Sequence, residues 1–249
     1  MIKPYTVCVL LYGDHPDLAE RVLSSLARPV WYRSFNLRIA WQNLSVESQM
    51  VLLKYVDIFM EKNDNPLLVG PLETCMKGQE PYYKYPMMRR LIRTHPITTP
   101  YVMWFDDDSL IRPDAPDEFF MDVGNVMAHC DICGHIWQWK WRGQQARYIK
   151  DQPWYNGKPI RKSIPFITGG WWTIRTEILA RHNWPPEDFE HNGGDAMLGE
   201  LCYQQGYTMK NYTRGVGINC DDSLVGSSAK RRGFSQPPIG VRYSPTRNK

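Results

Sequence analysis

The sequence predicts an α/β fold in which a mostly parallel central sheet carries helices on both faces. Short apolar runs alternate with amphipathic segments along most of the chain, which is the pattern that βαβ units produce. The runs YTVCVLLY and YVMWF are continuously apolar, as parallel strands covered on both faces are. With 43% hydrophobic and 22% charged residues, the 249-residue chain has the composition of a globular protein with an extensive core.

The N-terminal segment predicts a strand, a turn and a helix. The strand is expected from Tyr5 to Tyr12. In the turn that follows, Asp14 can accept hydrogen bonds from the first backbone N–H groups of a helix running from about Pro16 to Ala27. The apolar residues of this helix recur at helical spacing and are expected to face the sheet: Leu18, Val22, Leu23 and Leu26.

The next segment predicts a second strand, a second helix and a third strand. The second strand is expected from Asn36 to Trp41, and Ser45 is expected to cap a helix that ends near Tyr55. Val56 to Met60 is then expected to form the third strand, followed by a polar loop over residues 61–80. The apolar residues at helical spacing in the second helix are Val46, Met50 and Leu53.

From residue 81 onward helices and strands alternate again. The expected elements are, in order, a helix from Pro81 to Arg93, a strand from Tyr101 to Phe105, a helix from Asp117 to Met127, strands from Asp131 to Trp139 and from Ile164 to Ile174, helices from Arg175 to His182 and from Asp195 to Gln205, and a last strand starting at Gly206. Residues 140–164 are basic and aromatic, and are expected to be irregular. Residues 223–249 contain six basic and no acidic residues, so we expect a tail that orders on a ligand.

Several classes of protein are excluded. No stretch approaches the roughly 20 apolar residues that span a bilayer, and the start of the chain has no secretory signal pattern, so we expect a cytoplasmic protein, in the host cytoplasm if it is viral. Six scattered cysteines are too few for a disulfide scaffold. The spacing Cys130-x-x-Cys133 is compatible with zinc or redox chemistry, but buried free thiols are the more common state. The net charge of +4 does not by itself indicate nucleic-acid binding.

Three consecutive carboxylates, Asp106, Asp107 and Asp108, follow the apolar run YVMWF. They repel one another unless a cation lies among them. Residues i and i+2 of an extended segment face the same way, so Asp106 and Asp108 can point into one cleft. Mg²⁺ and Mn²⁺ sites commonly use one or two carboxylates together with substrate phosphates. The triplet therefore predicts a metal–phosphate site, with a solvated acidic turn as the alternative.

With these residues in place, the sequence resembles the GT-A nucleotide-sugar glycosyltransferases, most closely those of the family 2 type. Four segments carry the resemblance in order: YTVCVLLYGDHPDLAERVLSSL, YKYPMMRRLI, YVMWFDDDSLIRPD, and FITGGWWTIRTEIL followed by GGDAMLGELCYQQGY. It covers about residues 5–210. It implies a Rossmann-like GT-A domain over residues 1–215, with a donor half at about 1–114 and an acceptor half at about 115–215, and a basic tail or lid over 216–249.

The resemblance implies roles for the polar residues at the strand ends. Asp106 would contact the ribose or the metal, and Asp108 would hold the Mn²⁺ or Mg²⁺ that bridges the diphosphate of the donor, with a UDP-sugar favoured. Asp195 would be the base that takes the proton of the acceptor hydroxyl, and a single base attacking in line implies inversion. Tyr12 and Asp14 would lie by the nucleobase. The basic residues expected to reach the donor are Lys84 and Arg89.

Other candidate contacts come from glycine, tryptophan and the tail. Gly169 and Gly170 would let a sugar approach the backbone, and Trp171 would pack against it, with a tight bend as the alternative. The basic tail, including Arg231, would either contact nucleic acid or close over the diphosphate. The tryptophans that alternate along an expected strand would share one face, either packed on the core or stacked on bases: Trp137, Trp139 and Trp141.

The sequence departs from the family pattern at three places. Gly193-Gly194-Asp195 lacks the usual neighbouring Glu, although Glu190 and Glu200 are close in sequence. Trp41-Gln42-Asn43 replaces the usual acid after the second strand. No His follows His191, so Asp221, Asp222 or water would complete the metal shell.

The function that follows is sugar transfer from a nucleotide sugar to a hydroxyl. The acceptor is either a glycan or a hydroxymethylated pyrimidine in DNA, as in viral DNA modification. One alternative is a nucleotidyltransferase or another metal-dependent nucleotide enzyme, which would need a Gly-rich basic loop that Tyr12-Gly13-Asp14-His15 does not provide. The other is a nucleic-acid-binding module without catalysis.

Overall fold

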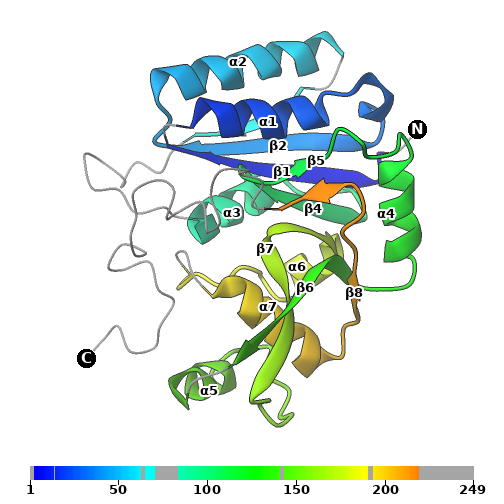
Figure 1. Ribbon diagram of the computed structural model, residues 1–249. Coiled ribbons are helices and arrows are strands. Elements are labelled where there is room, and N and C mark those ends of the chain that lie inside the picture. Colours follow the sequence, from blue (N-terminus) through cyan, green and yellow to red (C-terminus); the bar gives the residue numbers. More distant parts are fainter. Residues whose placement is uncertain are drawn as a thin grey trace.

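A seven-stranded sheet runs through the part of the protein that the computed structural model describes, which is residues 3–13, 15–62, 65–70, 84–140, 143–189 and 193–218. The strand order is β3-β2-β1-β4-β7-β6-β8 (Figure 1). The strands of this sheet are β1 (Tyr5–Tyr12), β2 (Phe35–Gln42), β3 (Leu67–Val69), β4 (Tyr101–Asp106), β6 (Ile132–Lys140), β7 (Ser163–Arg175) and β8 (Met209–Asn211). A small second sheet pairs β5 (Leu110–Ile111) with β9 (Val216–Gly217).

Most neighbouring strands of the large sheet are parallel, as the sequence predicts. Strand β1 pairs in parallel with β2 and with β4, β2 pairs in parallel with β3, and β6 with β8. Strand β7 is antiparallel to both β4 and β6. Its pairing with β4 begins at Trp171, whereas its pairing with β6 begins at Ser163. The first half of β7 and the second half of β6 therefore form a two-stranded ribbon that extends beyond β4.

Helices cover both faces of the sheet. They are α1 (Pro16–Leu26), α2 (Val46–Glu61), α3 (Lys84–Arg93), α4 (Phe119–Met127), α5 (Gly143–Lys150), α6 (Thr176–Arg181) and α7 (Gly194–Gln205), with a 3₁₀ turn η1 at Pro29–Trp31. Side chains of α1, α2 and α4 form one apolar core with the sheet, and those of α3, α5, α6 and α7 form the other. Figure 1 shows α1 and α2 above the sheet and α3 below it.

The prediction of a third strand at Val56 to Met60 is wrong, because α2 continues through this segment to Glu61. Ser45 caps the helix as expected, since its side chain accepts a hydrogen bond from the Ser48 N–H at 3.2 Å. No Gly or Pro interrupts the following turns. The buried face is also not the expected one: Val46, Met50 and Leu53 are exposed, and the side chains that face inward are Ser48, Leu52, Tyr55, Val56 and Phe59.

Two further regions differ from the expectations. Helix α5 lies in the segment that was expected to be irregular, and β3 lies in the segment expected to be a loop. Cys130 and Cys133 are buried free thiols, and burial raises the pKa of both. Within the described ranges, no helix is long and apolar enough to cross a membrane. The division into donor half, acceptor half and tail stays a prediction.

Candidate active site

Three polar side chains lie at the carboxyl ends of neighbouring parallel strands. Tyr12, the last residue of β1, is in register with Gln42, the last residue of β2. On the other side of β1, Leu10 is in register with Asp106 at the end of β4. Ligands of open α/β sheets bind at this edge, so the expected position of the site is consistent with the fold.

Asp106 is buried and both of its carboxylate oxygens accept hydrogen bonds. Oδ2 lies 2.7 Å from Nζ of Lys84, and Oδ1 accepts a hydrogen bond from the Trp104 indole N–H at 2.8 Å. Burial raises the pKa of Asp106 to about 6, and the ammonium group of Lys84 opposes that rise. Asp106 is therefore held by protein groups in this structure, and its expected contact with a ribose or a metal stays a prediction.

Lys84 connects Asp106 to the segment that holds Asp195. Its Nζ also donates to the Gly169 carbonyl oxygen on β7 at 2.7 Å. The Gly169 N–H donates to Oδ2 of Asp195 at 3.0 Å. The Tyr85 hydroxyl, next along α3, donates to the other oxygen of Asp195 at 2.9 Å. One chain of hydrogen bonds thus joins the end of β4, the middle of β7 and the start of α7, and we call it the Lys84 network.

Glycine at two positions makes this network possible. A Cβ atom at Gly169 would lie 2.6 Å from Nζ of Lys84 and 3.0 Å from Oδ2 of Asp195. A Cβ atom at Gly194 would overlap the ring of Tyr85. Gly193 precedes α7 with a φ of 82°, a conformation that other residues rarely adopt. Of the two glycines that the sequence associates with a close sugar, Gly169 therefore accommodates the Lys84 side chain of α3.

The acidic triplet supplies few metal ligands of its own. Asp108 is buried, and one of its carboxylate oxygens lies 3.5 Å from the Ser109 hydroxyl. In the described part of the chain, no group of three or more His, Cys, Asp or Glu side chains is placed to hold a metal ion. This donor set fits a hard cation bound by one or two carboxylates and by phosphate oxygens of a substrate, and it does not fit a cage made only of protein groups.

Two expected donor contacts have other roles in the structure. The guanidinium of Arg89 donates to the carbonyls of Pro186 and Phe189 and pairs with Glu187, so it fastens α3 to the segment before α7. Trp171 is fully buried, so it does not offer a surface to a sugar. Its ring packs in the core beside Phe105, Phe119 and Tyr212.

The remaining predicted site residues divide into two groups. Gly170 is buried within β7, and Tyr12 is buried at the end of β1. The other candidates lie outside the described residues: Asp14, Trp141, Glu190, Asp221, Asp222 and Arg231.

Gln42 is a residue that the sequence analysis noted only as a departure from the family pattern. Its side chain is 0% exposed, and neither its amide nitrogen nor its amide oxygen has a hydrogen-bond partner among the described residues. Leaving a buried polar group unpaired costs about 1–3 kcal/mol. An amide offers a donor and an acceptor side by side, which is the pattern on the pairing edge of a nucleobase. The residue type at the end of the second strand was the signal that could have identified it.

Comparisons with known proteins identify the fold. No protein-family model and no curated protein matches the sequence. Among solved structures, the mannosyltransferase PcManGT from Pyrobaculum calidifontis, in complex with GDP-Man and Mn²⁺, matches with a TM-score of 0.54 and 13% identity over 85% of this chain and 55% of that chain. Residues 1–349 of S. aureus TarS match with a TM-score of 0.50 and 14% identity over 83% of this chain and 58% of that chain.

These likenesses show that the chain has the GT-A fold of nucleotide-sugar glycosyltransferases. The chain spans a little over half the length of the two solved chains that it matches. A nucleoside-diphosphate-sugar pyrophosphorylase from Vibrio cholerae RC9 also matches, with 11% identity and a TM-score of 0.48 over 88% of this chain and 97% of that chain. A likeness at that level does not bear on the choice between transferase classes.

Proposed function

We propose that this chain is a metal-dependent, inverting glycosyltransferase that moves a sugar from a nucleotide sugar to a hydroxyl acceptor. The observation that carries the proposal is the Lys84 network at the carboxyl edge of a GT-A sheet. It places a candidate donor-side carboxylate, Asp106, and a candidate base, Asp195, two hydrogen-bonded groups apart.

Asp108 would hold the metal, together with oxygens of the donor diphosphate. When bound, a divalent cation stabilises the negative charge that forms on the departing diphosphate. PcManGT, which shares the fold, binds GDP-Man and Mn²⁺, and this supports a donor of the same chemical class. Lys84 would keep Asp106 in place beside that site, because its ammonium group pairs with the carboxylate.

Asp195 would take the proton from the acceptor hydroxyl. The Gly169 N–H and the Tyr85 hydroxyl each hold one of its oxygens, so the orientation of the carboxylate is fixed before the acceptor arrives. Each carboxylate oxygen has a second lone pair that can accept the acceptor's O–H. A base held on one side of the sugar carbon, opposite the departing diphosphate, would give inversion.

Gln42 and Tyr12 would read the nucleobase. Both are buried at the ends of adjacent strands. The unpaired amide of Gln42 would gain its missing hydrogen bonds from the base edge, and the ring of Tyr12 would pack beside it. A uracil edge presents an N–H and a carbonyl together, as a guanine edge also does, so this amide suits a UDP-sugar or a GDP-sugar.

The acceptor would lie on the β6–β7 ribbon, and it is either a glycan or a hydroxymethylated pyrimidine in DNA. Trp137 on this ribbon is 55% exposed, and its ring centroid lies 5.4 Å from that of His135. Trp137 is in register with Phe166, three residues before Gly169. An exposed indole at this position would pack against a sugar ring or stack on a base.

A thermal-shift experiment tests the metal-dependent donor site. UDP, GDP and their sugar conjugates are added to the protein with Mn²⁺ or with EDTA. At 100 times Kd a ligand stabilises the folded state by about 2.7 kcal/mol, which raises Tm by about 5–10 °C for a chain of this size. We expect that rise with one nucleotide family and only with Mn²⁺.

Two variants make the result specific. Asp108→Asn should abolish the Mn²⁺-dependent rise, whereas Asp117→Asn, at an exposed carboxylate outside the triplet, should retain it. An equal rise in Asp108→Asn and wild type would contradict the metal role. The absence of a shift with every nucleotide would contradict the transferase proposal, and release of pyrophosphate instead of a nucleoside diphosphate would assign the protein to the nucleotidyltransferases.

A further inference from the structure

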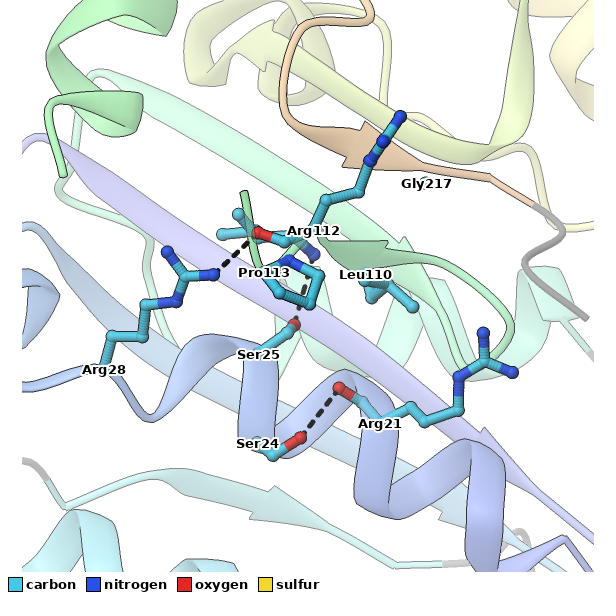
Figure 2. A pocket seen from close by; sticks show the side chains of 9 residues that line it. Arg21, Ser24, Ser25, Arg28, Leu110, Arg112, Pro113 and Gly217 are labelled. Atoms are coloured by element: carbon cyan, nitrogen blue, oxygen red, sulfur yellow. Dashed lines mark hydrogen bonds between the residues drawn. The ribbon is translucent and has the colours of Figure 1, made fainter. Parts of the chain in front are cut away.

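A cavity lies between helix α1 and the small β5–β9 sheet. Its volume is about 600 Å³, and it shares no lining residue with the candidate active site (Figure 2). Cavities of about 300–1,000 Å³ are the size that hold small ligands and nucleotides. The residues that line it are Arg21, Ser24, Ser25, Arg28, Leu110, Ile111, Arg112, Pro113 and Gly217.

Three arginines line the cavity. Figure 2 shows Arg21 and Arg28 on either side of two serines of α1, while Arg112, which follows β5, projects away from them. Arg112 is paired with the carboxylate of Asp114, at 3.1 Å from its Nε. The charges of Arg112 and Asp114 therefore cancel, so the positive charge of the cavity comes from Arg21 and Arg28.

Arg28 is held in place by groups that do not neutralise it. Its two terminal nitrogens donate to the carbonyls of Ala115 and Arg112, at 3.0 and 2.7 Å. Its guanidinium carbon lies 4.5 Å from the centroid of the Trp31 ring. Carbonyl oxygens and an aromatic face orient a guanidinium and leave its full charge, so this arginine is fixed beside the cavity as a cation.

Arg21 differs from Arg28 because its guanidinium has no partner in the described part of the chain. Among the described residues, no hydrogen bond or ion pair reaches its guanidinium, which Figure 2 shows at the end of the lining opposite Arg28. All five N–H donors of its planar fork are therefore available. The floor of the cavity is fixed, because the Ser25 hydroxyl accepts a hydrogen bond from the Ile111 N–H at 3.2 Å and so ties α1 to β5.

We propose that this cavity is a binding site for phosphate groups, with Arg21 and Arg28 as the cations at its two ends. The guanidinium fork matches two phosphate oxygens, and arginine is suited to phosphate for this reason. The apolar side chains of Leu110, Ile111 and Pro113 provide a surface for the part of the ligand that carries the phosphate. The phosphate can belong to a small free phosphate or to the backbone of a nucleic acid.

The test measures phosphate binding without the metal that the candidate active site would need. Inorganic pyrophosphate and a 12-base-pair DNA duplex are titrated by calorimetry in EDTA, into wild type, Arg21→Ala and Arg33→Ala. Arg33 is exposed in the turn before β2 and does not line the cavity, so it is a control with the same change of charge. We expect Arg21→Ala to weaken binding of at least one probe about 10-fold, and Arg33→Ala to leave it nearly unchanged.

The pattern of loss identifies the source of the phosphate. Weaker pyrophosphate binding assigns the site to small free phosphates. A loss confined to the duplex, with the slope of log K against log salt reduced by about 1, assigns it to a nucleic-acid backbone. If neither probe distinguishes Arg21→Ala from Arg33→Ala, the cavity is not a phosphate site. Since no donor or metal is present, this outcome is independent of the glycosyltransferase proposal.

Discussion

The two parts of the candidate site differ in how completely their polar groups are paired. At the junction of β4, β7 and α7, the carboxylates of Asp106 and Asp195 each accept two hydrogen bonds from protein groups. At the ends of β1 and β2, the amide of Gln42 is fully buried and has no partner in the described part of the chain. The paired region has its geometry set before any substrate binds, whereas the unpaired region leaves hydrogen bonds for a ligand to make.

This difference has an energetic meaning. A buried amide without partners lowers the stability of the folded protein, and a ligand that supplies those partners recovers the loss as binding free energy. A fully paired network gains nothing of that kind from a ligand. It instead holds the reacting groups in position, and this positioning lowers the free-energy barrier of the reaction. The junction is therefore suited to chemistry, and the β1–β2 end is suited to recognition.

Asp195→Asn should give the largest effect. The amide keeps the size of the side chain and can still accept a hydrogen bond from Gly169, but it cannot take a proton. We expect kcat for sugar transfer to fall about 10²–10⁴-fold, with the nucleotide-induced thermal shift unchanged. Tyr85→Phe keeps the ring packing against Phe189 and removes one hydrogen bond, so it should cost about 10-fold. A near-normal kcat in Asp195→Asn would mean that another group is the base.

Lys84→Met should give the next largest effect, on stability. It leaves the buried Asp106 carboxylate without its ion-pair partner, and breaking such a pair costs about 3 kcal/mol or more. The double variant Lys84→Met with Asp106→Asn should recover much of that loss, because no buried charge remains. Urea unfolding of the four proteins measures the coupling. Additive losses would show that the two side chains do not depend on each other.

Gln42→Leu should give the smallest effect. This variant separates the contribution of Gln42 to nucleotide binding from its contribution to the free energy of unfolding. Removing two unpaired buried polar atoms should leave the unfolding free energy equal or about 1 kcal/mol higher, while nucleotide affinity falls about 10-fold. Gln204→Leu is the matched control, since this glutamine is also 0% exposed but is bonded to Lys158 and Glu200. It should lose stability and keep nucleotide affinity. The same behaviour in both variants would remove the distinction between the two regions.

The elements with a strong local pattern could be predicted from the sequence. Strand β1 has the expected bounds, Tyr5–Tyr12, because every residue is buried and a turn follows it. The helix expected from Pro16 ends at Leu26, one residue before the expected end. Ser45 could be predicted as a cap because a serine hydroxyl readily accepts a hydrogen bond from the free backbone N–H groups at the start of a helix. Local chemistry decides these elements, and tertiary packing does not alter them.

The failures come from packing between segments far apart in sequence. Val56 to Met60 favours a strand by residue type, but the stripe formed by Leu52, Tyr55 and Phe59 buries against α1 only if the helix continues. Trp171 has the right neighbours for a sugar contact, yet β7 turns its ring toward Phe119. The role of Tyr85 and the isolation of Gln42 depend on which residues approach them in space, and sequence spacing does not contain that information.

The overhanging ribbon of β6 and β7 has a consequence for how chains with this arrangement of strands can diversify. Between Lys140 and Ser163 the chain leaves the sheet and returns, and the pairing of β7 with β4 begins only at Trp171. Insertions between Lys140 and Ser163 need not shift the pairing register of β1, β2 or β4. During evolution the ribbon can thus be lengthened, given new side chains or exchanged, while the strands that lead to the acidic triplet stay unchanged. In such an architecture, the surface of the ribbon and the geometry of the strand ends can change separately.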